Sequence, residues 1–133
     1  MYTIQGKISH IKNIQKYKAC LECKKKLLII SDEEFRCEHC KQSLRTYNLR
    51  VILNVLVFDQ SGNLWMTIFQ EKLEQLFGSK FNNEFLSDDA KFDKWSETLL
   101  HKNYKICVKS TIQKFNNQDI LKNICYSIKL LNE

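Results

Sequence analysis

The stretch that decides the fold opens with Cys20-Leu21-Glu22-Cys23 and closes with Cys37-Glu38-His39-Cys40, two CxxC pairs separated by residues 24–36. Each CxxC turn brings two thiolates within reach of one metal ion, and Zn²⁺ binds four such ligands in a tetrahedron. The intervening residues suit a β-hairpin, with strands at 27–30 and 35–36 and a turn at 31–34. The spacing predicts a zinc ribbon that holds one structural Zn²⁺ through Cys20, Cys23, Cys37 and Cys40.

Four cysteines can instead form disulfides or a redox site. The sequence shows no signal-peptide pattern and its lysine-rich composition has no secretory character, so we expect a reducing compartment, which favours metal over disulfide. A catalytic zinc usually keeps one position open for water, whereas four thiolates close the coordination shell. His39 lies inside the second turn and is an alternative ligand, but we expect it on the surface beside the metal.

Length and composition favour one domain with one core, because the chain has 133 residues, of which 44% are hydrophobic. No apolar run approaches the roughly 20 residues of a membrane-spanning helix, so we expect no membrane partner. The net charge of +6 suggests an anionic partner, with nucleic acid ahead of a membrane surface. The sequence shows no paired carboxylates, no nucleophile with a matched base and no phosphate-binding glycine loop, which predicts that the protein is not an enzyme.

Hydrophobic alternation predicts five strands around the ribbon, which we place at about residues 17–45. Ile4 and Ile8 share a parity that Ile11 breaks, so the first strand should contain a bulge or bend. The other four strands are expected at residues 47–58, 64–69, 103–115 and 120–131. Turns are expected at residues 59–63 and 116–119.

Two helices are expected between the third and fourth strands. The first covers residues 71–77 and stops at Gly78, and residues 79–86 follow as a loop. The second begins at a cap, Ser87 or Asp88, and runs to about residue 100. Its apolar stripe predicts core positions at Phe92, Trp95, Leu99 and Leu100.

Cys107 and Cys125 lie on the last two strands, where a disulfide has to be considered. A turn centred between Asn117 and Gln118 would place Cys107 opposite Ile128 and Cys125 opposite Ser110. The two cysteines would then be about three residues out of register, too far apart for a bridge. We therefore expect both to be reduced.

The third strand separates an apolar face from an aromatic one. Its apolar face, made by Leu64, Met66 and Ile68, is predicted to face the core, while Trp65 and Phe69 lie on the opposite face, roughly 13 Å apart. Large aromatic side chains are usually buried, so both could lie beneath a helix or the ribbon. Alternatively, each stacks against a base of a single-stranded nucleic acid.

The order of the expected elements is strand, ribbon, strand, strand, helices, strand, strand. This is the order of an OB-fold, a five-stranded Greek-key barrel that binds oligonucleotides across its second and third strands and the flanking loops. The predicted fold class is therefore all-β with minor helices. A single OB-fold domain spans residues 1–133, with the ribbon between strands 1 and 2 and the helices between strands 3 and 4.

Four runs of residues carry a family resemblance. They are Tyr17-Lys18-Ala19-Cys20, Phe35-Arg36-Cys37-Glu38-His39-Cys40, Leu49-Arg50-Val51-Ile52-Leu53 and Leu64-Trp65-Met66-Thr67-Ile68-Phe69-Gln70-Glu71. From about Ile8 to Leu131 the chain resembles the C-terminal DNA-binding domain of the replication protein A large subunit, which telomere- and telomerase-associated paralogues share. The resemblance implies a nuclear single-stranded DNA binder, sequence-tolerant or specific for telomere repeats, that works with other OB-fold subunits in replication, repair or telomere maintenance.

In that family the domain continues into a C-terminal helix that joins three subunits, whereas this sequence ends at Glu133 directly after the last expected strand. We therefore expect either a fragment of a longer chain or trimer formation outside it. By position, the family's stacking aromatics match Trp65 and Phe69, and Phe115 in the last hairpin is a candidate third aromatic contact. Arg50 and Asn54 are expected on the outward face of the second strand, where they could contact phosphates or base edges.

Lysines make the ribbon basic, and Lys24 and Lys41 are the candidate DNA contacts among them. Solvated surface is the alternative interpretation of these lysines. The alternative function is a protein-interaction or assembly module of the same kind of complex, with little DNA affinity of its own. Binding to single-stranded DNA that weakens steeply with salt would favour the first function.

Overall fold

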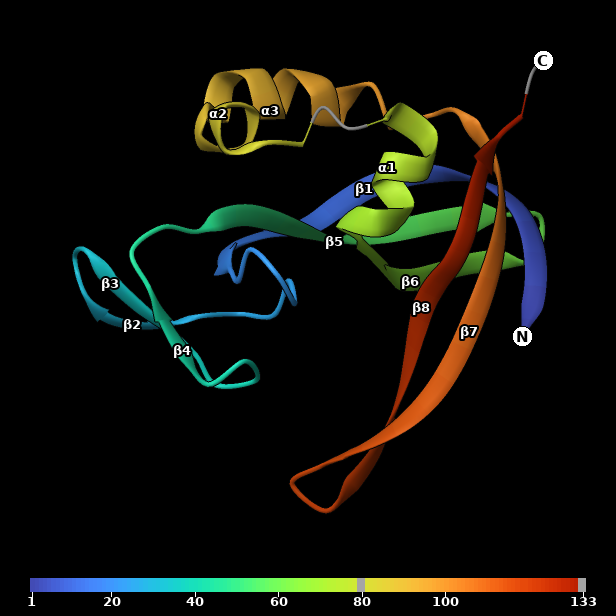
Figure 1. The fold of residues 1–133 in the computed structure, drawn as a ribbon. Helices are drawn as coiled ribbons and strands as arrows, with labels where there is room; N and C mark the ends of the chain where they lie inside the picture. The colour runs from blue at the N-terminus through green and yellow to red at the C-terminus, as the bar shows by residue number, and fades with distance from the viewer. Residues whose placement is uncertain (79–80, 132–133) are drawn as a thin grey trace.

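The computed structural model describes residues 1–78 and 81–131, apart from the side chain of Phe115. Five long strands are β1 (Tyr2–Ala19), β5 (Asn48–Asp59), β6 (Gly62–Phe69), β7 (Asn103–Phe115) and β8 (Gln118–Leu130). They close into a barrel in the spatial order β1-β5-β6-β8-β7 (Figure 1). Neighbouring strands are antiparallel except β6 and β8, which meet in parallel where Thr67 pairs with Ile124. This mostly β architecture matches the predicted OB-fold barrel.

β1 curves so that it can pair with two strands, with β7 along its first residues and with β5 beyond them. Register shifts after Ile8 and after Ile11 confirm the predicted bulge. A Cβ atom at Gly6 would lie 2.7 Å from the carbonyl oxygen of Phe58, so this close approach of β1 to β5 requires glycine. β1 also runs further than predicted, because Ala19 still pairs with Asn48, so the insertion starts at residue 20 rather than at about 17.

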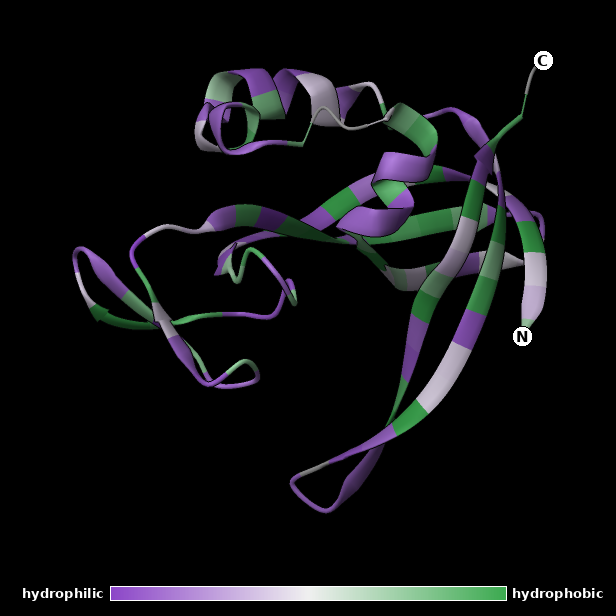
Figure 2. Cartoon of the chain, viewed as in Figure 1, coloured by the Kyte–Doolittle hydropathy of each residue, from purple (hydrophilic) through white to green (hydrophobic). Residues whose placement is uncertain are grey.

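The core fills the barrel with alternate residues of its strands. Val51, Leu53, Val55 and Val57 of β5 are fully buried or nearly so. Met66 and Ile68 of β6 join them, as do Tyr104, Ile106 and Val108 of β7, which confirms the predicted inward faces. Figure 2 shows hydrophobic stretches along β5 and β7, the strands that supply many of these residues. The opposite face of β5 and β6 is thereby left outside the core.

Between β6 and β7, the described residues form three helices: α1 (Gln70–Phe77), α2 (Asn83–Ser87) and α3 (Asp89–Glu97). α1 ends as predicted at Gly78, whose φ is 76°. α3 is capped by Asp88, one of the two predicted cap residues, whose side chain accepts a hydrogen bond from the backbone N–H of Lys91 at 3.1 Å. The predicted stripe is confirmed as core at Phe92, Trp95 and Leu99.

α2 replaces part of the predicted loop 79–86, of which residues 79 and 80 lie outside the described residues. Asn82 explains the helix, because its side chain accepts a hydrogen bond from the backbone N–H of Phe85 at 2.8 Å and so caps the first turn. Tertiary contacts hold it in place: the ring of Phe85 meets the rings of Phe81 and Trp95 edge-on. No helix in the described parts of the chain is both long and apolar enough to cross a membrane.

The β7–β8 hairpin turns at Asn116 and Asn117, whose φ angles are 50° and 64°. Two consecutive residues with positive φ form the tight turn that suits a twisted hairpin. The turn is therefore centred one residue earlier than predicted, and the register differs as well: Cys107 pairs with Ser127, and Cys125 pairs with Val108. Both cysteines are free, and burial raises the pKa of Cys125 to about 12, which keeps it a neutral thiol.

The segment between β1 and β5 folds into a separate three-stranded sheet with the order β2-β3-β4, formed by β2 (Leu28–Ser31), β3 (Glu34–Cys37) and β4 (Gln42–Leu44). The predicted hairpin strands are confirmed to within about two residues, whereas β4 was not predicted. Figure 1 shows this sheet standing to one side of the barrel. It has a small core of its own, in which Leu27 and Phe35 are buried beside Cys20 and Cys37.

Candidate metal centre and nucleic-acid interface

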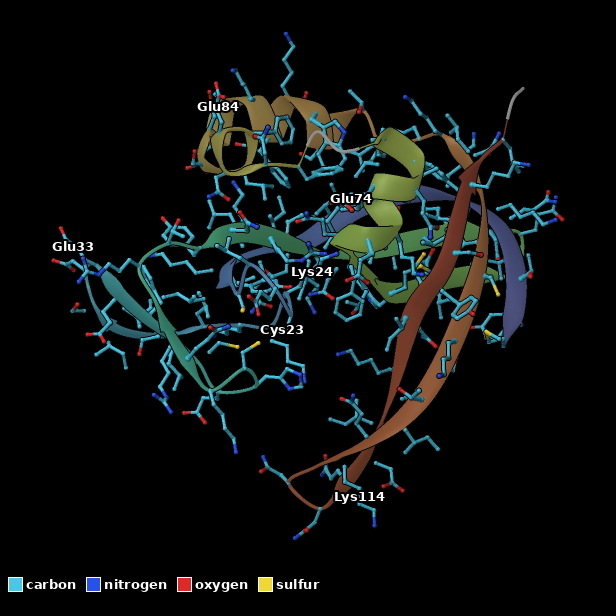
Figure 3. The ribbon with its side chains drawn as sticks, viewed as in Figure 1. Cys23, Lys24, Glu33, Glu74, Glu84 and Lys114 are labelled. Atoms are coloured by element: carbon cyan, nitrogen blue, oxygen red, sulfur yellow. The ribbon has the colours of Figure 1, made fainter. Side chains whose placement is uncertain are left out.

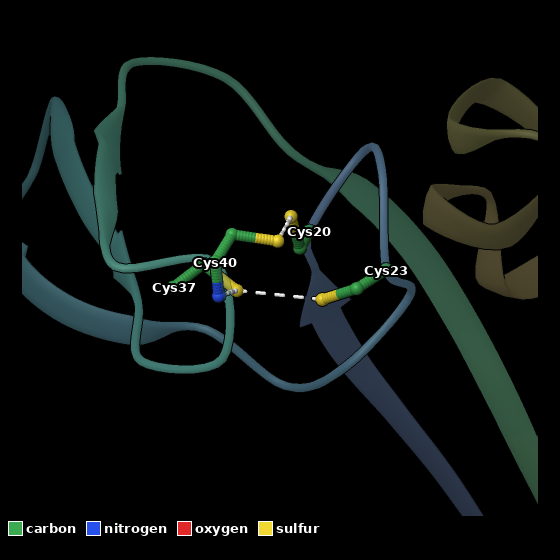
Figure 4. A group of neighbouring side chains, drawn as sticks. All are labelled: Cys20, Cys23, Cys37 and Cys40. Carbon is green, nitrogen blue, oxygen red and sulfur yellow. Dashed lines mark hydrogen bonds between the residues drawn. The ribbon is translucent and has the colours of Figure 1, made fainter.

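Four cysteines meet where the small sheet joins the barrel. Cys20 follows the end of β1, Cys37 ends β3, and Cys23 and Cys40 lie in the turns that follow them. All four Sγ atoms lie within 4.8 Å of one another, with Cys23–Cys37 at 3.4 Å and Cys20–Cys40 at 3.9 Å (Figure 4). Thiolates bound to one Zn²⁺ at about 2.3 Å are roughly 3.8 Å apart, so the cluster has the dimensions of a tetrahedral zinc site.

Hydrogen bonding within the cluster gives the thiols different pKa values. The backbone N–H of Cys40 donates to Sγ of Cys37 at 3.3 Å, and this bond lowers the pKa of Cys37 to about 7. The hydrogen bond with Cys23, followed by burial, raises the pKa of Cys40 to about 12. Thiolates this close together repel one another, which disfavours ionisation of all four thiols. A bound dication would offset that repulsion. His39 is exposed, with Nδ1 3.4 Å from Nζ of Lys25, and it lies on the surface as expected.

The outer face of β5 and β6 carries the predicted aromatic pair. Trp65 is 48% exposed, while Met66 and Ile68 are buried on the opposite face, so the predicted parity of β6 is confirmed. The interpretation that buries Trp65 under a helix or the insertion is therefore wrong. Phe69 is half-buried, on the same face as Trp65 and four residues further along the strand.

A groove of about 270 Å³ lies against Trp65. Three strands besides β6 contribute to its walls, namely β1, β5 and β8. The lining residues are Lys12, Asn13, Asn54, Trp65, Met66, Thr67, Leu121, Lys122 and Asn123. The groove thus combines an exposed indole ring, three side-chain amides and two ammonium groups.

Contacts inside the groove orient these groups. Nζ of Lys12 lies 5.2 Å from the centroid of the Trp65 ring, within the range of a cation–π interaction. Thr67 donates its hydroxyl to Oδ1 of Asn54 at 2.8 Å, and Asn123 donates from Nδ2 to the carbonyl oxygen of Trp65 at 3.2 Å. A planar aromatic surface flanked by cations and amides suits a ligand that combines flat rings with negative charge.

The structure brings Trp65 and Asn54 together, as the sequence predicted, but it places Arg50 differently. The side chain of Arg50 is only 8% exposed, and its Nη2 lies 3.3 Å from Oε1 of Glu71 at the start of α1. The predicted contact of Arg50 with DNA would therefore have to compete with this ion pair, which forms because α1 follows β6 directly.

Two of the predicted lysines lie outside the groove. Lys24 and Lys41 are exposed, with φ angles of 64° and 53°, in the turns that follow Cys23 and Cys40. Figure 3 shows Lys24 next to Cys23 in the small sheet's base. Phe115 ends β7 directly after Lys114, which Figure 3 labels near the tip of the hairpin, and the side chain of Phe115 lies outside the described residues.

Sequence reasoning missed Lys12, Asn13, Lys122 and Asn123. The last two reach Trp65 only because β8 closes the barrel against β6, where Thr67 pairs with Ile124. Lys12 and Asn13 occupy the second bulge of β1, where the register with β5 shifts. The break in parity at Ile11 was the single sequence signal for an unusual backbone at this point.

Comparison with known proteins places the chain in a family. The family model described as "Replication factor-A C terminal domain" matches residues 1–133. Replication factor A protein 1 of Saccharomyces cerevisiae is 26% identical over 137 residues, which cover 98% of this chain and 22% of the relative. The replication protein A 70 kDa DNA-binding subunit of Xenopus tropicalis is 26% identical over 120 residues, covering 85% of this chain and 19% of the relative. The chain thus spans about a fifth of the length of these relatives.

Solved structures agree with this placement. One described as "Yeast RPA bound to ssDNA" superimposes with a TM-score of 0.80 at 26% identity, covering 99% of this chain and 78% of that one. A second, "Structure and Conformational Change of a Replication Protein A Heterotrimer Bound to ssDNA", gives a TM-score of 0.81 at 23% identity over 98% of this chain and 31% of that one, a likeness of fold. The resemblance inferred from the sequence is confirmed.

Proposed function

Because the chain belongs to the replication factor-A C-terminal domain family, we propose that it binds single-stranded DNA through the groove beside Trp65. It acts as one OB-fold among the subunits of a replication protein A-like complex in the nucleus, in general replication and repair or at telomeres. Its role is binding rather than catalysis. The similar yeast RPA structure, at 26% identity, is bound to single-stranded DNA, which supports this assignment.

The single observation that carries the proposal is the exposure of Trp65 in a basic groove. A tryptophan that leaves 48% of its surface in water on a sheet, with a lysine above its ring, provides a stacking surface. Stacking against an aromatic side chain is worth roughly 1–3 kcal/mol per base and tolerates any base, because every base has a π-face. Lys12 and Lys122, which line the same groove, supply cations for the phosphates.

We assign the other predicted contacts around this centre. Phe69 offers a second stacking ring, and Asn54 a hydrogen-bonding edge within the groove. Lys24 and Lys41 extend the positive surface onto the small sheet. Phe115 is assigned as a third aromatic contact because it is the last residue of β7, at the tip of the hairpin. Arg50 instead fixes α1 through its ion pair with Glu71.

We propose that the four cysteines hold one structural Zn²⁺, so that residues 20–47 form a zinc ribbon. The donor set supports this metal, because four sulfur atoms within 4.8 Å of one another match the number and softness of ligands that structural zinc prefers. The ion would tie the end of β1 to the turn after β3. A strand of only four residues, such as β2 or β3, gains from such a cross-link, because its sheet buries few side chains.

A salt-dependent titration tests the function. Fluorescence anisotropy of a labelled oligonucleotide should show binding that weakens as salt rises. A single strand gives a slope of about −0.7 in log K against log salt per phosphate contact, so four lysines (Lys12, Lys122, Lys24 and Lys41) predict a slope of about −3.

A matched control separates specific contacts from overall charge. Lys122→Ala should weaken binding and reduce the slope by about 0.7, whereas Lys94→Ala, which removes an exposed lysine of α3, should leave both unchanged. Equal effects of the two variants would contradict the assignment of the groove. No binding even at low salt would instead support an assembly module that contacts protein subunits.

A further inference from the structure

A second exposed aromatic ring, that of Phe58 in β5, lies on the same outer face of the sheet as Trp65. Phe58 is 54% exposed, while Val57 beside it is buried in the barrel. Leu56 pairs with Trp65 across the two strands, and Phe58 follows Leu56 by two residues, so Phe58 is the diagonal neighbour of Trp65. Diagonal neighbours in an antiparallel pair are roughly 7–8 Å apart, so the two rings lie side by side on one face.

Basic side chains of β1 run alongside these two rings. Lys7 pairs with Phe58 across β1 and β5, so the two side chains share the outer face. Nζ of Lys12 lies 5.2 Å from the centroid of the Trp65 ring. His10 lies between the two lysines on the same face, and all three side chains are exposed. The outer face thus carries aromatic rings along β5 and β6 and basic groups along β1.

A hollow of about 830 Å³ opens beside Phe58, where β1 passes the turn between β5 and β6 (Figure 1). Lys7 lines this hollow, together with Gln5 and Gln60. A single-stranded nucleic acid binds where an aromatic ring meets a base and a cation meets a phosphate, and amides can hydrogen-bond to base edges. The hollow therefore offers the groups that a nucleotide needs.

The acidic residue Asp59 also lines the hollow. The hydroxyl of Ser61 donates to its Oδ1 at 2.7 Å, and the backbone N–H groups of Ser61 and Gly62 donate to it at 2.8 and 3.0 Å. These hydrogen bonds lower the pKa of the Asp59 carboxyl, so it is charged at neutral pH. A carboxylate repels phosphate, so we expect a nucleotide here to keep its phosphate on the side of Lys7.

We propose that the hollow beside Phe58 is a further nucleotide subsite, in which Phe58 stacks against a base and Lys7 contacts a phosphate. The inference rests on the proposed binding of single-stranded DNA, and it extends the bound strand from the groove beside Trp65 to the turn between β5 and β6. Phe58 and Trp65 then hold nearby bases of the same strand. Stacking on protein rings tolerates any base, so the subsite lengthens the footprint without reading sequence.

Substitutions at Phe58 test the stacking role by fluorescence anisotropy with a labelled oligo(dT) of about 12 nucleotides, a length within the range that one OB-fold covers. Phe58→Ala should bind at least about fivefold more weakly than the wild type. Phe58→Leu should lose as much affinity, because it keeps an apolar side chain without a π-face, whereas Phe58→Tyr should bind like the wild type. Tyr126→Ala, which removes a ring that is 52% exposed on β8, should also bind like the wild type.

The salt dependence of the same titration tests the phosphate contact. Lys7→Ala should make the slope of log K against log salt less steep by about 0.7, the value for one phosphate contact on a single strand. Lys94→Ala, which removes an exposed lysine of α3, should leave the slope unchanged. An unchanged slope in Lys7→Ala would overturn the phosphate contact.

Two results would overturn the stacking subsite and leave the proposed function intact. One is Phe58→Ala binding within about twofold of the wild type, on an oligonucleotide that Trp65→Ala binds at least about fivefold more weakly. The other is Phe58→Leu binding like the wild type, because the contact would then not depend on a π-face. A wild type that does not bind the oligonucleotide even at low salt would overturn the proposed function, and the subsite with it.

Discussion

The two tryptophans of the chain provide a direct test of the proposed stacking surface. Trp65 lies on the outer face of β6 and is 48% exposed, whereas Trp95 belongs to α3 and is 7% exposed. Changing each to alanine removes the same side chain from two environments. If Trp65 stacks against one base, its loss costs roughly 1–3 kcal/mol of binding free energy, so Trp65→Ala should bind single-stranded DNA about 5- to 150-fold more weakly.

The free energy of unfolding should fall less in Trp65→Ala than in Trp95→Ala. A tryptophan of about 250 Å² keeps roughly 130 Å² covered at position 65 and roughly 230 Å² at position 95. At about 25 cal/mol per Å², the losses in the free energy of unfolding reach at most about 3 and about 6 kcal/mol. Trp95 adds the cost of a cavity, because its ring packs against Phe77, Phe81 and Phe92.

The assay pairs anisotropy titration with denaturant unfolding of the same preparations, so that affinity is expressed per folded molecule. We expect Trp65→Ala to lose mostly affinity and Trp95→Ala to lose mostly stability. Trp65→Ala binding within about twofold of the wild type would refute the stacking role. Equal affinity losses in the two folded variants would show that binding depends on the barrel as a whole rather than on the exposed ring.

Three further changes test other parts of the molecule. Cys37→Ser should bring bound zinc well below one equivalent by metal analysis, and full zinc retention would contradict the ligand assignment. Chelation should first remove hydrogen-exchange protection from residues 20–47, because the barrel has a separate core. Gly6→Ala should lower the free energy of unfolding by about 1–3 kcal/mol in denaturant titration, because the new Cβ would meet the Phe58 carbonyl oxygen at 2.7 Å. Phe69→Ala should weaken DNA binding about 5-fold or more in the same titration, and unchanged affinity would leave Trp65 as the stacking residue on this face.

The structure departs from the sequence predictions where distant residues interact and where neighbouring turn positions are equally suitable. Arg50 has the parity of an outward residue, but Glu71 of α1 turns it into a buried ion-pair partner. The register of the last hairpin was wrong because Asn116 and Asn117 both adopt positive φ, a choice between neighbouring turn positions that the Asn-Asn-Gln-Asp run leaves open. α2 is too short to produce a periodic pattern, and its position depends on aromatic contacts from Phe85.

By itself, the sequence determined the four-cysteine cluster, the five strands and the two faces of β6, because each depends on spacing within a few residues along one backbone. The CxxC turns bring thiolates together locally, and a period of two places Trp65 opposite Met66 in any strand. Only the tertiary structure decided which groups surround Trp65. Lys12 and Lys122 are brought there by the bulge in β1 and by the closure of β8 against β6, and strand pairing between distant segments is set by the packing of the whole barrel.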